Sequence, residues 1–115
     1  MNLIEFVNQF PPALCLLMAS RGSRPLSARD MEKRSGIPKS TINKLTLNGW
    51  GSADVGTIDT FMSACGVNLF DAKRLNEKRK RKTWKRLANA PARDRIYFLK
   101  LVNRAKETGL ASKAD

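Results

Sequence analysis

The sequence predicts an all-α fold, a compact helical bundle, and two observations carry this prediction. Apolar residues recur at helical spacing in one segment after another along the 115 residues. Residues that begin or end helices stand between these segments, among them Ser27, Gly36 and Pro91. A chain of this length has room for one compact domain with at most an accessory element.

Two helices are expected at the start of the chain. The first covers Asn2–Phe10, and the dipeptide Pro11-Pro12 ends it and opens a second helix that runs to about Ala19. We expect the apolar residues of both helices to be core residues without a role in a site. These residues are Leu3, Phe6, Val7, Phe10, Leu14, Leu17 and Met18.

Two short helices joined by a tight turn are expected next. Ser27 is a suitable N-cap for a helix over residues 28–34, in which Met31 faces inward. Gly36 stands where this helix must end, because glycine enters the left-handed conformation without a Cβ penalty. Pro38 suits the first turn of the following helix, where its missing N–H costs nothing.

The second helix of this pair, at about residues 38–47, has a polar outer face. Ile42 and Leu45 are spaced three apart and face inward. A short helix that shows only hydrogen-bonding and cationic side chains is suited to reading base edges in the major groove of DNA. The expected base-reading residues are Lys39, Ser40, Thr41, Asn43 and Lys44.

Residues 26–70 resemble the lambda-repressor/Cro-like (XRE-type) helix-turn-helix family. The matching motifs are Ser35-Gly36-Ile37 at the turn, Lys39-Ser40-Thr41-Ile42 at the start of the recognition helix, Asn48-Gly49 in the loop, and Thr57-Ile58, Phe61, Cys65-Gly66-Val67 and Leu69 in the supporting helix. The resemblance implies a helix-turn-helix DNA-binding domain over residues 1–70. It implies a sequence-specific regulator of transcription that binds double-stranded DNA, of the repressor type found in phages, plasmids or bacteria.

Glu32 departs from the pattern of this family, which commonly has alanine at that position, packed against the second helix. A buried carboxylate without a partner would be costly. We therefore expect Glu32 to face outward or to pair with Lys33, Lys39 or Lys44.

The segment Thr46–Val55 is expected to be a polar, glycine-rich loop around Trp50. Trp50 can either pack on the core or touch sugar and phosphate, and packing is favoured because aromatic area is usually buried. Neutral donors that follow a recognition helix often meet phosphate oxygens. The expected contacts to the DNA backbone in this half of the chain are Arg29, Thr46 and Asn48.

Most of the positive charge lies in a basic C-terminal extension, residues 71–115. The chain has a formal net charge of +12 and a pI of about 10.4, which is typical of nucleic-acid binding. Residues 1–70 contribute +2 and residues 71–115 contribute +10, of which the run 73–86 holds +8. In isolation such a run repels itself and is disordered or only partly helical, whereas phosphates would order it.

This basic run has two interpretations. In the first, it lies along the DNA backbone through Lys78, Arg79, Lys80, Arg81 and Lys82. In the second, it is a solvated surface helix without a partner. A non-specific nucleic-acid-binding protein, coating DNA or binding RNA through this run, is the alternative function. The chain lacks the stacking aromatic residues expected of a single-strand binder.

A final helix is expected over Ala92–Thr108, with a broad apolar stripe. The stripe is formed by Ile96, Tyr97, Phe98, Leu99, Leu101, Val102 and Ala105. It offers more apolar surface than a lone terminal helix should expose. We expect it to form a homodimer interface, and the alternative is that it folds back on Phe6, Phe10 and Trp84 within one protomer.

The sequence argues against an enzyme, a metal site or a cofactor. It contains no histidine, no glycine-rich phosphate loop and no clustered carboxylates. Cys15 and Cys65 stand in apolar helical patterns and are expected to be buried core thiols. Neither a convincing signal peptide nor a window of about 20 apolar residues is found, so we expect no membrane partner and a cytoplasmic location.

Overall fold

All regular secondary structure that the computed structural model describes is α-helical, which confirms the predicted all-α bundle. The structure describes residues 3–51, 53–69 and 73–107. The helices in these ranges are α1 (Leu3–Asn8), α2 (Pro12–Ala19), α3 (Ala28–Ser35), α4 (Lys39–Asn48), α5 (Val55–Ala64), α6 (Lys73–Ala88) and α7 (Ala92–Glu107).

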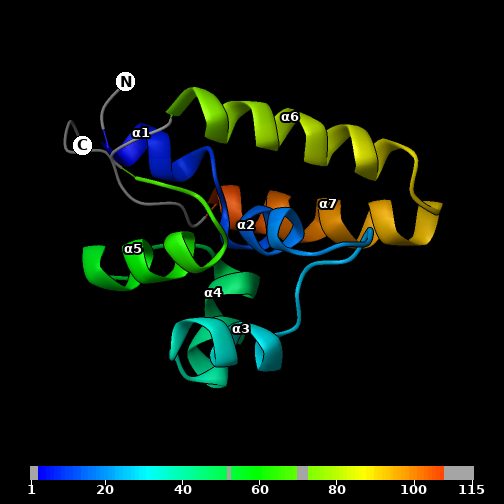
Figure 1. The fold of residues 1–115 in the computed structure, drawn as a ribbon. Helices are drawn as coiled ribbons and strands as arrows, with labels where there is room; N and C mark the ends of the chain where they lie inside the picture. The colour runs from blue at the N-terminus through cyan, green and yellow to red at the C-terminus, as the bar shows by residue number, and fades with distance from the viewer. Residues whose placement is uncertain (1–2, 52, 70–72, 108–115) are drawn as a thin grey trace.

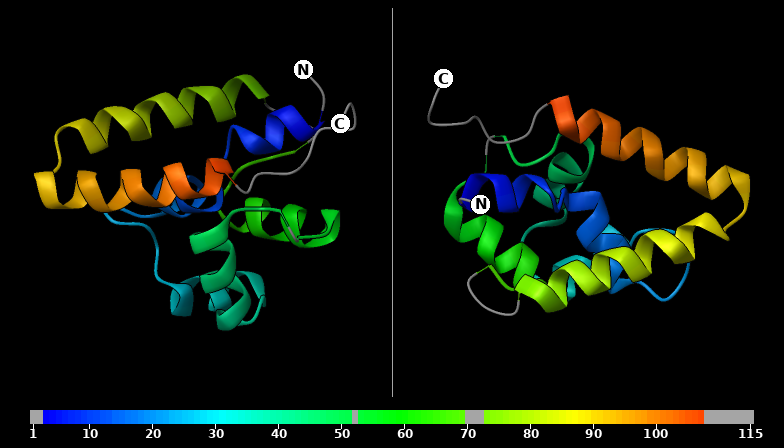
Figure 2. Two further views of the ribbon diagram at one scale, coloured as in Figure 1. Left: turned by 180° about the vertical axis from the view of Figure 1, so that it is seen from behind. Right: turned by 90° about the horizontal axis from the view of Figure 1, so that it is seen from above.

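The helices are arranged around α2 (Figure 1). The long helices α6 and α7 pack against α2 and against each other. The helix pair α3–α4 forms the opposite end of the molecule, where α4 also contacts α2 and α7. Figure 2 shows the same order from behind, with α6 at one edge, α2 and α7 between, and α3–α4 at the other.

One hydrophobic core serves the whole bundle. The side chains of α2 from Pro12 to Met18 are all buried, so this helix lies at its centre. Leu87 of α6 and Phe98 and Val102 of α7 belong to the same cluster. The segments 1–70 and 71–115 therefore share one core, and the boundary between them falls at residues outside the described ranges.

The first helices begin and end close to their predicted positions. The structure has α1 over Leu3–Asn8, two residues shorter at its C-terminal end than the predicted Asn2–Phe10, while Asn2 lies outside the described residues. Pro12 is the first residue of α2, where a proline costs no hydrogen bond. The helix ends at Ala19, as predicted.

The pair α3–α4 is built by the local signals that its sequence contains. The Ser27 side chain accepts a hydrogen bond from the Asp30 N–H at 3.1 Å and so caps α3. Gly36 has φ 77° and ends the helix in the left-handed conformation. Pro38 differs slightly from expectation, because it precedes the first helical residue, and α4 covers Lys39–Asn48 instead of 38–47.

Trp50 packs in the core, as favoured, and the alternative that it touches sugar and phosphate is wrong. Its side chain is 1% exposed, and its ring lies edge-on to Phe61 with 5.1 Å between centroids. The indole Nε1–H donates to the Phe10 carbonyl at 2.9 Å, so its polar atom is satisfied. The following helix α5 is capped by Asp54, which accepts from the Thr57 N–H at 2.7 Å.

The basic helix α6 docks mainly through polar side chains. Arg79 donates to the carbonyls of Gly66 and Cys65, just after α5. Arg86 donates to the Leu17 carbonyl at 2.6 Å and the Ser20 carbonyl at 3.2 Å, at the end of α2. The Leu17 carbonyl also accepts from the backbone N–H and the hydroxyl of Ser20. The C-terminal end of a helix carries partial negative charge, so both arginines stabilise helix ends.

A third polar anchor lies nearer the start of α6. Asn76 is 1% exposed, and its amide donates to the Asn68 carbonyl at 2.6 Å and accepts from the Asn68 N–H at 3.3 Å. Between these anchors, Trp84 packs edge-on against Phe98 of α7 with 5.4 Å between ring centroids. α6 is therefore a continuous, docked helix although its sequence has few apolar residues.

The apolar stripe of α7 is divided between the core and the surface. Phe98, Leu101 and Val102 are buried, with at most 6% exposed, so their expected place in a dimer interface is wrong. Ile96 and Leu99 remain 55% and 44% exposed. The stripe is broad because α7 packs against three helices, α2, α4 and α6. The sequence of α7 alone does not show how many neighbours it has. Thr108, the predicted last residue of this helix, lies outside the described residues.

Candidate nucleic-acid interface

The outer face of α4 is polar. Together with α3, this helix lies at one end of the molecule (Figure 1). Ile42 and Leu45 are buried and hold the helix to the core, as their spacing predicted. Thr41 is half-buried. The other four residues expected to read bases are exposed, and they are Lys39, Ser40, Asn43 and Lys44. Hydrogen-bonding and cationic groups therefore occupy the accessible side of this helix.

Glu32 of α3 fixes the start of α4. It faces outward, in agreement with the first of the two expectations, and its Oε2 accepts from the Lys39 backbone N–H at 2.7 Å. The first N–H groups of a helix have no intrahelical acceptor, and a carboxylate there is also favoured by the helix dipole. Glu32 thus caps the helix across the turn, a role that its sequence position did not reveal.

The three neutral or cationic residues expected to contact the DNA backbone lie in different places. Arg29 is exposed in the first turn of α3, and Asn48 is exposed at the last residue of α4. Thr46 is half-buried, and its hydroxyl donates to the Ile42 carbonyl at 2.7 Å. That proton is committed within the helix, which leaves Arg29 and Asn48 as the available donors.

Beside α4 lies a hollow of about 240 Å³. Asn43 and Thr46 of α4 form one wall, Tyr97 of α7 forms another, and the segment 24–28 closes it. Arg24 and Asn43 both belong to this lining, so they border the same hollow. The sequence analysis did not identify Arg24 or Tyr97 as site residues.

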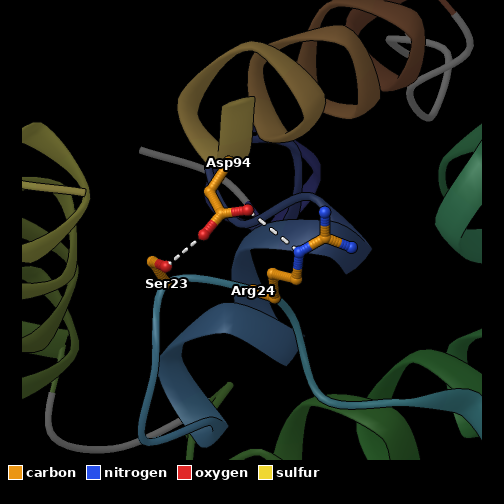
Figure 3. A network of polar contacts seen from close by, with 3 residues as sticks. All are labelled: Ser23, Arg24 and Asp94. Atoms are coloured by element: carbon orange, nitrogen blue, oxygen red, sulfur yellow. Dashed lines mark hydrogen bonds and ion pairs between the residues drawn. The ribbon is translucent and has the colours of Figure 1, made fainter. Parts of the chain in front are cut away.

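Arg24 is held in place by Asp94 (Figure 3). Its Nε donates to Asp94 Oδ1 at 2.9 Å, and Ser23 donates its hydroxyl to Oδ2 at 2.6 Å. The guanidinium also lies over the Tyr97 ring, 5.2 Å from the centroid. In Figure 3 the two terminal nitrogens point away from Asp94, and within the described ranges they make no hydrogen bond. They are free to bind an anion.

The carboxylate of Asp94 is charged at neutral pH and can therefore hold Arg24. Hydrogen bonds from Ser23 and Arg24, together with the positive charge of Arg24, hold the pKa of Asp94 below its usual value of 3.8. It is therefore ionised at neutral pH. A charged residue on the otherwise apolar, buried face of α7 was the sequence signal that could have identified this cluster.

Leu47 is a third residue of this region that was not expected from sequence. Its side chain is 45% exposed on the outer face of α4, one helical turn from Asn43 and Lys44. If this face reads bases, an apolar group among its polar residues is suited to contact with a thymine methyl. The signal was its position, since Leu47 lies off the inward stripe formed by Ile42 and Leu45.

The five basic residues expected to follow the DNA backbone do not share one face of α6. Lys78, Arg81 and Lys82 are exposed. Arg79 is engaged by the carbonyls of Gly66 and Cys65, and the Lys80 ammonium lies 5.2 Å from the centroid of the Phe10 ring. Figures 1 and 2 place the whole helix at the end of the molecule opposite α3–α4.

Both cysteines are free and buried, as expected. Burial raises the pKa of the Cys65 thiol to about 12 and that of Cys15 well above its usual value. Protonated thiols are poor nucleophiles and metal ligands. Within the described residues, no group of three or more side chains of the metal-binding types could hold an ion.

Comparisons of the chain with known protein families, with curated proteins and with solved structures found no match. In the part of the chain that the structure describes, no helix has the length and apolar character needed to cross a membrane.

Proposed function

We propose that this protein is a sequence-specific regulator of transcription that binds double-stranded DNA and inserts the N-terminal half of α4 into the major groove. One observation carries the proposal: the exposed face of α4 is polar and cationic and stands at an end of the molecule, while Ile42 and Leu45 anchor the helix behind it. An anchored helix with such a face meets the geometric demand of base reading.

Each exposed side chain has a chemical role in this proposal. Asn43 can pair with the N6 and N7 edge of adenine, and Lys44 with O6 and N7 of guanine. Lys39, Ser40 and Thr41 can bond to base edges or to the adjoining phosphates. Arg24 and Arg29 flank the helix and supply positive charge for the DNA backbone.

The resemblance to the lambda-repressor/Cro-like helix-turn-helix family supports a regulator of the repressor type, from a phage, a plasmid or a bacterium. The turn between α3 and α4 comprises only Gly36–Pro38, and Gly36 takes the left-handed conformation expected there. Met31, at 0% exposed, fills the inward position of α3. These features agree with the packing of a helix-turn-helix motif.

A two-fold homodimer is part of the proposal. One recognition helix reads only a few base pairs, and helix-turn-helix proteins commonly double the site by placing two such helices on successive turns of the duplex. Ile96 and Leu99 of α7 supply exposed apolar surface for self-association. A palindromic DNA site would follow from this symmetry.

Selection of bound duplexes from a random pool tests the function. We expect a shared motif, and an affinity for that motif at least about 1,000 times the affinity for random duplex. Competition with unlabelled random duplex and with single strands supplies the control. Equal competition by all three nucleic acids would contradict the proposal.

The alternative, a non-specific nucleic-acid-binding protein, is favoured by the exposed cations of α6. In that case selection would return no motif, and single strands would compete as well as duplex. Replacing Asn43 and Lys44 by alanine would then leave binding unchanged, whereas neutralising Lys78, Arg81 and Lys82 would abolish it.

A further inference from the structure

Four cations form a ridge along the outer face of α6. The α6 ridge consists of Lys78, Arg81, Lys82 and Lys85, all exposed. Their spacing of three or four residues places them on one side of the helix. At 1.5 Å per residue the ridge spans roughly 10 Å, a length over which duplex DNA carries about six charges.

The ridge is not neutralised by the protein. The ion pair between Arg24 and Asp94 involves no ridge residue. Glu77 is the single acidic residue between 73 and 88, and it forms no ion pair with a described ridge residue. Like charges at these spacings repel one another, so the ridge is suited to a polyanion.

α6 is also held so that the ridge faces away from the core. Arg79 and Arg86 bind the carbonyls at the ends of α5 and α2, and Asn76 pairs with Asn68. These anchors share one side of α6, turned away from the ridge, and oppose rotation of the helix about its axis. The ridge is therefore a fixed part of the surface.

The ridge and the exposed face of α4 lie at opposite ends of the molecule. α6 contacts α2 and α7, which separate it from the pair α3–α4 (Figures 1 and 2). Duplex DNA has a persistence length of about 50 nm, so over the dimensions of this protein it behaves as a stiff rod. The ridge lies on the side of α6 opposite the buried residues Asn76, Thr83 and Leu87. A straight duplex held against α4 would therefore have to bend around the molecule to reach the ridge.

We propose that the α6 ridge binds the phosphate backbone of a second DNA segment, so that the protein bridges two duplexes. This inference rests on the proposed function of α4, because it takes that face to be occupied by the first duplex. The second contact is independent of sequence, since phosphates carry no base information. The protein would then join its specific site to any neighbouring DNA.

A two-duplex capture assay tests the bridge. An immobilised duplex carries the selected motif, the full-length protein is added, and a fluorescent random duplex without the motif is then offered. We expect the parent to capture the fluorescent duplex, with a loss of about 100-fold between 50 and 200 mM salt if four phosphate contacts each contribute about 0.9 to the logarithmic slope.

The ridge variant replaces all four ridge residues by glutamine. We expect its affinity for the immobilised motif to stay within twofold of the parent, while capture of the second duplex falls at least tenfold. The matched control replaces four exposed cations elsewhere by glutamine, namely Arg21, Arg93, Lys100 and Lys106. It removes the same formal charge, and we expect it to keep most of the capture.

The remaining outcomes separate the bridge from the function on which it rests. If the ridge variant still captures the second duplex, the α6 ridge does not form the bridge. This result is expected if a dimer binds each duplex with a different α4 face. Equal loss of capture in the control variant also overturns the bridge, because bulk charge would then explain the effect. A parent that shows no preference for any motif overturns the proposed function itself.

Discussion

The exposed side chain of Arg24 is held in place by the buried carboxylate of Asp94. Asp94 lies on the inner side of α7 and binds both Ser23 and Arg24 of the loop between α2 and α3. Long side chains lose rotamer entropy when they bind a ligand. Because Asp94 and the Tyr97 ring already orient the guanidinium, Arg24 is prepared for an anion beside α4.

The Asp94 cluster makes the stability of the protein dependent on pH. The pKa of Asp94 is lower in the folded protein than its usual value, so this carboxylate stabilises the fold above that value. The contribution is lost as the pH falls through the pKa of the folded state. Asp94→Asn should therefore lower the urea midpoint at pH 7, and the gap to the parent should narrow below about pH 4.

Urea unfolding of both proteins between pH 2 and 7 measures this difference. Glu107→Gln removes an exposed carboxylate from the same helix and serves as the control. A gap between Asp94→Asn and the parent that is constant over the whole range would contradict the prediction.

Asn43 and Lys44 carry the prediction on base reading. Replacing either by alanine should cost about 1–3 kcal/mol in binding free energy and relax the preference at one position of the motif. Fluorescence anisotropy with single-base variants of the motif measures both effects. Lys85→Ala removes a charge from the far side of the molecule and should leave this single-duplex affinity nearly unchanged. If both α4 variants retain full selectivity, the recognition helix lies elsewhere.

At the scale of elements, α6 is attached by helix capping more than by an apolar face. Arg79 satisfies carbonyls after α5, and Arg86 satisfies carbonyls at the end of α2. Gly66 adapts to this contact. It has φ 79°, and a Cβ there would approach within 2.7 Å of Arg79 Nη1. The C-terminal ends of two helices, which carry partial negative charge, thus supply the partner that a highly basic helix needs.

Replacing Arg79 should therefore affect stability before it affects DNA binding. Arg79→Gln removes charged hydrogen bonds to the carbonyls of Cys65 and Gly66, which should cost about 1–3 kcal/mol in the free energy of unfolding. Its neighbour Lys78 is exposed, and Lys78→Gln should change that free energy by less than about 0.5 kcal/mol. Equilibrium urea unfolding measures the free energy of unfolding of both variants. Equal free energies would contradict the prediction, because Arg79 would then contribute no more than an exposed surface cation.

At the scale of the whole molecule, the shared core joins the basic segment rigidly to α2. The helix α4, with its polar face, and the α6 ridge are consequently held at opposite ends. The exposed part of the α7 stripe, Ile96 and Leu99, remains accessible for association with a second copy. Three surfaces of different chemistry therefore occupy three parts of one bundle.

Self-association should depend on the exposed residues of α7 alone. A variant with Ile96→Asp and Leu99→Asp should fold with a thermal midpoint close to the parent but sediment as a monomer, and its affinity for a palindromic motif should fall. Val102→Asp is the contrasting change, because Val102 is 4% exposed and a buried charge without a partner should unfold the protein. A monomeric parent would contradict the dimer.

Some features of this protein followed from sequence because they depend on residues close together in the chain. Ser27 and Gly36 act on the ends of the adjacent helix, and the spacing of Ile42 and Leu45 defines one inward face. For the same reason the sequence identified the polar face of α4. Trp50 was also expected to be buried, since its large aromatic area favours packing.

Other features required the tertiary structure, because their partners lie far away in the chain. Glu32 binds Lys39 across the turn, Arg24 meets Asp94 about 70 residues later, and Arg86 caps a helix that ended 67 residues earlier. The sequence determined that the protein is helical, strongly basic and equipped with one polar helix face. Only long-range packing decided which cations remain free and where they face, because burial and capping select among chemically equivalent lysines and arginines.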